Sequence, residues 1–298
     1  MNPLTINATS VATAAGPSVS VDLRCAPTLL TDAEVADLAA RWEAELAAAV
    51  DVVAGTGDVG LSPSDVPGTG VTQHDLDVLA ERYPAAEIWP LTPLQRGLLF
   101  QVEVAARDVV DVYVTQAVLH LEGDVDLDRL QRATTDLLDH HRVLRSGFVR
   151  TPGGVGVAVV PSAVGIGWRR VDLTGTPDAA AQVSAIAADD KVVPFDLTRP
   201  ALLRVIAITH DGGVSIVLTS HHLLFDGWSA PLVLADLLAL YATGTTYTGG
   251  LGNAQTGSGA PDFADHVRRI AQSDDRAGLA AWRQVLAPLG EPTLVAPE

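Results

Sequence analysis

The chain has 298 residues, of which 48% are hydrophobic, enough for one large or two modest domains with packed cores. A net charge of -17 excludes the basic face that a nucleic-acid-binding protein needs. The single cysteine, Cys25, excludes an internal disulfide framework or a cysteine-rich zinc site and favours a reducing compartment. Residues 1–14 lack a secretory signal pattern, and no stretch approaches the roughly 20 apolar residues that span a bilayer. We therefore expect a cytoplasmic protein that binds neither nucleic acid nor membrane.

The first 66 residues predict a helical tail. Residues 1–20 are small and polar and predict no firm element. Thr31 and Glu34 form a capping-box pattern before apolar residues at helical spacing, which are Val35, Leu38, Trp42, Leu46 and Ala49. Residues 55–70 are rich in Gly, Pro, Ser and Asp and read as a loop. We place the tail at residues 1–66 and a linker at residues 67–85.

Two helix starts follow. Thr72 can cap a short helix that carries Leu76 and Leu79. In the stretch from residue 87 to 100, Thr92 is an N-cap, Pro93 occupies the first helical position, and Gln95 completes a capping box. The local chemistry thus predicts a second helix that begins at Pro93.

Strand and helix patterns then alternate up to residue 243. Strand patterns cover residues 112–121, 168–171 and 214–219, and Gly153-Gly154 predicts a hairpin turn. Helices are expected after Asp126, Asp178 and Ser229. Residues 244–258 read as a loop, and two further helices follow it. This order predicts an α/β fold, an α+β sandwich in which helices flank a mixed sheet.

The chain is organised around the turn His221-His222-Leu223-Leu224-Phe225-Asp226-Gly227-Trp228-Ser229. Adjacent histidines at the end of a strand point to opposite faces, so only one of them can face a given cavity. Asp226 can brace the turn, and Gly227 permits a backbone angle that other residues resist. A buried, hydrogen-bonded histidine pair is the ordinary interpretation of such a pattern. A metal site ranks low, because no third ligand lies at helical or hairpin spacing nearby.

The string His-His-x-x-x-Asp-Gly-Trp-Ser resembles the active-site motif of nonribosomal peptide synthetase condensation domains. These domains belong to an acyltransferase superfamily that includes chloramphenicol acetyltransferase. Residues 87–100 resemble the opening block of the family, and residues 141–148 resemble its second block. Residues 20–66 are similar to the closing segment of an epimerization or condensation domain. The resemblance implies a chloramphenicol-acetyltransferase-like N-terminal lobe over residues 86–262. Residues 263–298 would begin the crossing into a second lobe, which we expect to be absent.

The resemblance also assigns roles. His222 matches the catalytic histidine, which acts as a general base or positions the attacking amine. Arg145 would pair with Asp226 to hold the turn, and His221 would pack. The Gly227 backbone N–H would lie near the developing oxyanion. No metal or bound cofactor is implied, because the substrates are carried on the phosphopantetheine of partner carrier proteins.

Three functions stay open. The chain can be a condensation-domain fragment, joining a D-terminated donor to an L-acceptor only when a partner chain supplies the second lobe. It can instead be a non-catalytic module that binds carrier proteins. A third possibility is a self-contained, CoA-dependent acyltransferase whose site forms between subunits. Only the third requires a homo-oligomer, so the oligomeric state discriminates it from the other two.

Overall fold

The computed structural model describes residues 4–13, 16–26, 28–56, 60–105, 111–243, 262–274 and 276–290. The chain divides into two compact units, residues 1–60 and residues 61–298, and each is described by itself. Within the described ranges, no helix is long and apolar enough to cross a membrane. The loop expected over residues 244–258 lies outside the described residues.

The first unit consists of a hairpin and a helix. Strands β1 (Leu4–Thr13) and β2 (Gly16–Cys25) pair antiparallel. Helix α1 covers Asp32–Thr56, and the predicted capping box between Thr31 and Glu34 is confirmed by bonds in both directions. The hairpin corrects the expectation that residues 1–20 form no element. Thr, Val and Ile favour strands, and pairing supplies the backbone partners that a lone segment of this composition lacks.

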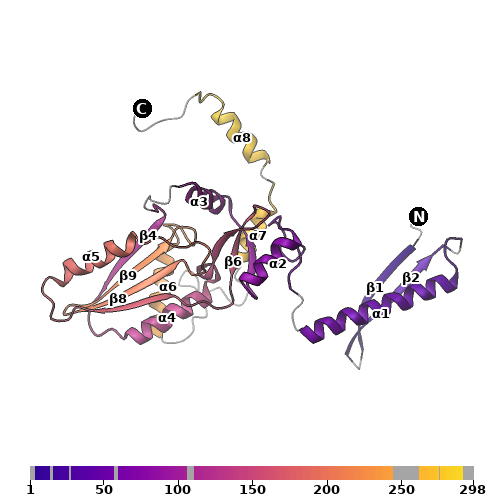
Figure 1. Cartoon of the computed structure of the whole chain (residues 1–298), viewed down its shortest axis with the longest axis horizontal. Helices are drawn as coiled ribbons and strands as arrows, with labels where there is room; N and C mark the ends of the chain where they lie inside the picture. The colour runs from indigo at the N-terminus through magenta and orange to yellow at the C-terminus, as the bar shows by residue number, and fades with distance from the viewer. Residues whose placement is uncertain are drawn as a thin grey trace. The chain divides into compact units, whose positions relative to one another are not determined.

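The second unit is built on a mixed four-stranded sheet in the order β4-β9-β8-β7. β7 runs parallel to β8, and the other pairs are antiparallel, so the predicted mixed sheet is confirmed. The four strands are β4 (Val114–Leu121), β7 (Gly167–Asp172), β8 (Leu203–His210) and β9 (Gly213–His221). In Figure 1, helix α5 lies on one side of this sheet and helices α4 and α6 lie on the other. These helices are α4 (Leu127–His140), α5 (Ala179–Lys191) and α6 (Ala230–Thr243).

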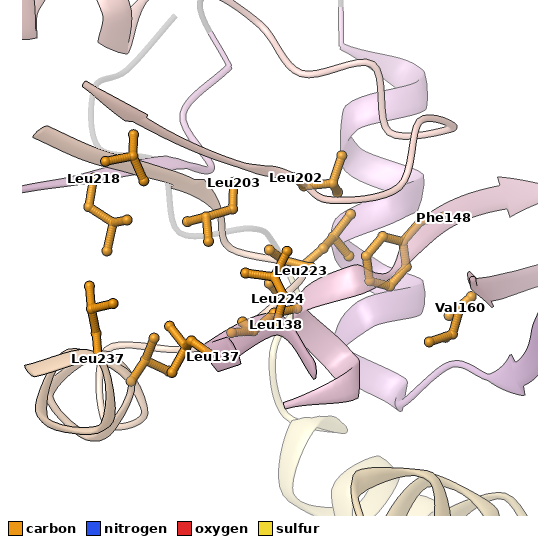
Figure 2. Packing of buried hydrophobic residues seen from close by; sticks show 14 of the residues in the cluster. Leu137, Leu138, Phe148, Val160, Leu202, Leu203, Leu218, Leu223, Leu224 and Leu237 are labelled. Atoms are coloured by element: carbon orange, nitrogen blue, oxygen red, sulfur yellow. The ribbon is translucent and has the colours of Figure 1, made fainter. Parts of the chain in front are cut away.

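The main core lies between the sheet and helices α4 and α6. Leu137 and Leu237 point from the two helices toward the leucines of β8 and β9, as Figure 2 shows. Successive strand residues face opposite sides, so Ile216 and Leu218 contact this core while Val217 packs beneath α5. Each fully buried side chain of this kind stabilises the fold by about 1.5–3 kcal/mol. Both faces of β9 are therefore buried, which fixes the strand that carries the histidines.

A smaller antiparallel sheet, in the order β3-β6-β5, continues the lobe. Its strands are β3 (Glu87–Pro90), β5 (Gly147–Arg150) and β6 (Gly156–Val160). The predicted turn at Gly153-Gly154 joins β5 to β6, and the positive φ of Gly154 explains the glycine. The remaining elements are α3 (Pro93–Val104), the 3-10 turn η1 (Arg142–Arg145), α7 (Phe263–Ala271) and α8 (Arg276–Leu286).

Residues 67–85, expected as a linker, pack against this smaller sheet instead. Helix α2 covers Gln73–Arg82, and the capping box of Thr72 is formed with Asp75. The structural boundary falls after Gly60. One buried cluster joins residues 66–79 to the smaller sheet. Its members are Val66, Val71, Leu76, Leu79, Ile88, Val149, Val157 and Val159. The Gly, Pro, Ser and Asp content of residues 55–70 predicted a loop or linker at this boundary, but the valines and leucines that follow supply enough apolar surface to hold residues 67–85 in place.

Candidate functional site

The paired histidines lie where β9 ends and the chain turns toward α6. His221 is the last residue of β9, and α6 begins at Ala230, so the predicted strand, turn and helix are all present. The backbone N–H of His221 donates to Leu202, and that of His222 donates to Tyr113. Hydrogen bonds to two neighbouring segments thus fix the end of β9. The fixed backbone in turn determines the direction in which each histidine side chain points.

His221 is fully buried and has partners at both ring nitrogens. The Leu223 backbone N–H donates to Nδ1 over 3.1 Å, so the ring proton sits on Nε2, which donates to Asp111 Oδ2 over 3.2 Å. Burial lowers the pKa of His221, although the nearby Asp111 carboxylate acts in the opposite direction. His221 is therefore a neutral, packed imidazole at pH 7, and its partner Asp111 was not anticipated from the sequence.

His222 faces a cavity of about 520 Å³ on the other side of the strand end. Its Nδ1 is buried without a hydrogen-bond partner in the described part of the chain. No described side chain bonds its Nε2 either. A buried ring nitrogen without a partner costs free energy, and such costs are characteristic of functional positions. His222 is thus the histidine of the pair that lines the cavity and whose ring nitrogens no described residue engages.

The helix predicted at Pro93 anchors this turn. Gln95 forms the expected capping box with Thr92, and its Nε2 also donates to the Leu223 backbone oxygen over 3.0 Å. Gln95 is buried and lines the same cavity as His222. The opening block and the histidine turn are therefore one hydrogen-bonded structure. Sequence spacing could predict the cap but not the second bond, which joins residues 128 positions apart.

A second histidine–carboxylate pair lies at the cavity wall. His141 Nε2 is 2.7 Å from Asp236 Oδ2, and Asp236 is buried on α6. His141 lines the cavity with His222, and His266 of α7 lines it as well. Sequence reasoning assigned these residues no role. The signal that could have found them was Asp236 itself, a lone carboxylate within the leucine-rich stretch of α6, because a buried charge needs a partner.

Arg145 and Asp226 do not pair, which corrects the expected ion pair. The Arg145 guanidinium is buried and donates to the backbone oxygens of Pro161, Leu138 and Asp139, at 3.0, 3.1 and 3.4 Å. It also lies 3.3 Å from the Asp139 carboxylate. The donors of Arg145 are thus used to join the end of α4 to the loop after β6. Asp226 is exposed and finds its donors within its own turn, so it needs no distant cation.

Asp226 is the brace of the turn, as predicted, but through local bonds. Its Oδ1 accepts from the Ser229 hydroxyl at 2.8 Å and from the Ser229 backbone N–H at 2.9 Å. The Ser229 hydroxyl, followed by the Ser229 N–H, lowers the pKa of Asp226 below its usual value. This carboxylate therefore caps the start of α6.

We expect Asp226→Ala to lower the free energy of unfolding by about 1 kcal/mol, the typical effect of losing a helix cap. Ser229→Ala, which removes only the hydroxyl bond, should cost less. Urea unfolding of both variants gives the comparison. A loss of about 3 kcal/mol or more for Asp226→Ala would instead indicate that a buried charge had been left unpaired.

Gly227 does not supply the unusual backbone angle that we expected. The positive-φ glycines of the described chain do not include it, and a Cβ built there meets nothing within 4 Å. The fold therefore places no conformational or steric demand on this position.

The arrangement of this lobe recurs in solved structures of one enzyme group. The starter condensation domain of rhizomide synthetase aligns with a TM-score of 0.57 at 19% identity, covering 69% of this chain and 49% of that chain. The epimerization domain from the third module of tyrocidine synthetase B aligns with a TM-score of 0.57 at 18% identity, covering 72% and 48%. At these identities the likeness establishes the fold, which is that of chloramphenicol-acetyltransferase-like domains.

Sequence comparison narrows this class to one family. Residues 85–297 match the Condensation domain family, and the chain belongs to it. Bacitracin synthase 1 of Bacillus licheniformis is 25% identical over 232 residues, which cover 76% of this chain and 4% of that protein. Malpinin synthetase of Mortierella alpina is 30% identical over 210 residues, which cover 69% and 3%. The chain thus spans about half of each solved domain and a few per cent of these relatives.

Proposed function

We propose that this lobe forms one wall of the peptide-bond-forming site of a nonribosomal peptide synthetase condensation domain. The observation that carries the proposal is the contrast within the histidine pair. His221 has both nitrogens engaged by the protein, whereas His222 faces the cavity with neither nitrogen bonded by a described residue. His222 is therefore the group available to the reacting atoms.

In the proposed reaction, the amine of one carrier-bound substrate attacks the thioester carbon of another. A C–N bond forms, the C–S bond breaks, and the proton that leaves the amine ends on the departing thiolate. His222 accepts that proton or holds the amine by a hydrogen bond. The N–H of Gly227, which lies in the exposed turn between the cavity-lining residues Asp226 and Ser229, would donate to the developing oxyanion.

Both substrates would arrive as thioesters on the phosphopantetheine arms of carrier proteins, and no cofactor would be held by the lobe. The second half of such a domain, in a longer polypeptide or a separate chain, would supply the opposite wall. Without that wall, water enters the site and the substrates are not positioned. We therefore propose that residues 1–298 alone do not form peptide bonds.

We further propose selectivity for a D-terminated donor and an L-acceptor. The support is the likeness of residues 20–66 to the end of an epimerization domain, together with the motifs at residues 87–100 and 221–229. An upstream epimerization step delivers a mixture of stereoisomers. The next condensation step then has a chemical reason to select one of them through the shape of its donor channel.

The test joins this chain to a complementary second lobe and supplies loaded carrier proteins, with product measured by mass spectrometry. His222→Ala should lower turnover by about 10²–10⁴-fold, the usual contribution of a positioned acid or base. His74→Ala, which changes an exposed histidine of α2, is the matched control and should leave turnover unchanged.

Melting temperatures of both variants separate a catalytic effect from a folding effect. Full activity in a folded His222→Ala variant would contradict the catalytic assignment. Donors that differ only at the terminal α-carbon test stereoselectivity in the same assay. Faster turnover of the L-terminated donor would contradict the D-to-L assignment and leave the assignment of His222 intact.

A further inference from the structure

A second hollow, of about 320 Å³, lies between α5 and the main sheet. Its polar end is formed by His120 of β4, His210 of β8 and Ser215 of β9, and its apolar wall includes Val118, Val183 and Ala187. Ser215 is close to the start of β9, whereas His222 follows its end. At about 3.3 Å per residue, the strand separates the two positions by roughly 23 Å. This hollow is therefore distinct from the cavity that His222 lines.

The three polar side chains form one hydrogen-bonded cluster. His120 and Ser215 are directly opposite in the pairing of β4 with β9, and His120 Nδ1 lies 2.8 Å from Ser215 Oγ. His210 Nε2 lies 2.9 Å from the same oxygen. The Gly212 backbone N–H donates to His210 Nδ1 over 3.2 Å. One fully buried hydroxyl thus joins two imidazoles.

These bonds determine where each proton sits when both rings are neutral. His210 Nδ1 accepts from Gly212, so the His210 proton is on Nε2 and is donated to Ser215 Oγ. Among the described residues, His120 Nδ1 is then the one acceptor available to the hydroxyl, so we assign the hydroxyl proton to the bond from Ser215 to His120. His120 therefore carries its proton on Nε2, and no described residue accepts it. The cluster ends in a hydrogen-bond donor at the polar end of the hollow.

The same proton positions argue against two other uses of the cluster. A metal ion needs an unprotonated ring nitrogen, but His210 Nε2 holds a proton and its Nδ1 is already occupied by Gly212. A serine nucleophile must be reachable by its substrate, but Ser215 is fully buried. The open donor of His120 is the feature that a ligand can use.

We propose that this hollow binds a small, mainly apolar molecule that carries a carboxylate. The carboxylate accepts the Nε2 proton of His120, in a charge-assisted bond that is stronger than a bond between neutral groups. The apolar part packs against Val118 and Val183 and over the small side chains of α5, Ala180 and Ser184. Because the chain has a net charge of -17, long-range attraction does not favour an anion. Binding depends on the local donor and the apolar wall.

The experiment uses the full chain and 4-phenylbutyrate as the probe, followed by NMR of the imidazoles and of the valine methyl groups. We expect shifts at His120, Val118 and Val183 that saturate at millimolar probe. His120→Leu and Ser184→Leu should each weaken binding at least tenfold, the first by removing the donor and the second by filling the hollow. Ala188→Leu, an exposed change on α5 that does not line the hollow, is the matched control and should bind as the wild type does.

All three substitutions change exposed residues, so melting temperatures should confirm that the variants fold. The neutral amide of the probe should bind more weakly than the carboxylate. Equal or tighter binding of the amide would overturn the assignment of the ligand class. Absence of shifts at millimolar probe, shifts confined to the His222 cavity, or equal binding by Ser184→Leu and Ala188→Leu would overturn the site.

Discussion

Replacing Arg145 with alanine is expected to lower the free energy of unfolding by about 3 kcal/mol or more. The guanidinium donates to three backbone oxygens and approaches the Asp139 carboxylate, while its side chain is only 9% exposed. Truncation removes a donor from the buried Leu138 carbonyl and from two partly buried carbonyls, and a buried group left without a partner costs about 1–3 kcal/mol. Arg145→Lys should recover only part of the lost unfolding free energy, because a single ammonium group cannot reach all the acceptors that the guanidinium contacts.

The measurement is urea unfolding followed by circular dichroism, with Arg132→Ala as the matched control. Arg132 is an exposed arginine of α4, and its loss should change stability by no more than about 0.5 kcal/mol. A double-mutant cycle between Arg145→Ala and Asp226→Ala addresses the ion pair directly. Because the two side chains make no contact, their effects should add. A coupling energy of about 1 kcal/mol or more would restore the pairing that the sequence suggested.

The predicted Arg145–Asp226 ion pair was wrong, and it shows which contacts cannot be predicted from the sequence. Residue type and spacing fix local bonds, so the caps at Thr31, Thr72, Thr92 and Asp126 were all predictable from residues within one helical turn. A buried arginine can satisfy its donors with backbone oxygens anywhere in the fold, and the sequence does not reveal which. The need for partners was predicted correctly, but their identity was not.

The same limit applies at the cavity. The strand, turn and helix around His222 follow from hydrophobic periodicity and the start of α6, and the sequence predicted that one histidine of the pair would face a cavity. Gln95 to Leu223 and His141 to Asp236 are contacts between elements far apart in the chain. They depend on how α3, α4 and α6 pack around β9, which periodicity does not specify. The packing of residues 61–85 against the smaller sheet depends in the same way on which elements meet in the fold.

The acid stability of this lobe should depend strongly on one carboxylate, that of Asp75. Asp75 is buried at the start of α2 and accepts from the Thr72 N–H at 2.9 Å, the Thr72 hydroxyl at 2.8 Å and the Gly153 N–H at 2.8 Å. The Thr72 N–H, then the Gly153 N–H, holds the pKa of Asp75 well below its usual range. These bonds join α2 to the hairpin between β5 and β6. Asp75→Ala should therefore cost about 3 kcal/mol at neutral pH.

The pH dependence has a definite sign. A carboxylate whose pKa is lower in the folded state stabilises the fold above its unfolded pKa, about 3.9 for aspartate, and this stabilisation is lost as the pH falls toward the folded value. Urea unfolding across acidic pH should therefore show a steeper loss of stability below about pH 4 for the wild type than for Asp75→Asn. Other capping carboxylates are present in both proteins, so the difference isolates Asp75. Asp77→Asn, an exposed change on the same helix, should keep the wild-type slope. Parallel curves for the wild type and Asp75→Asn would mean that the ionised carboxylate is not what holds α2 to the hairpin.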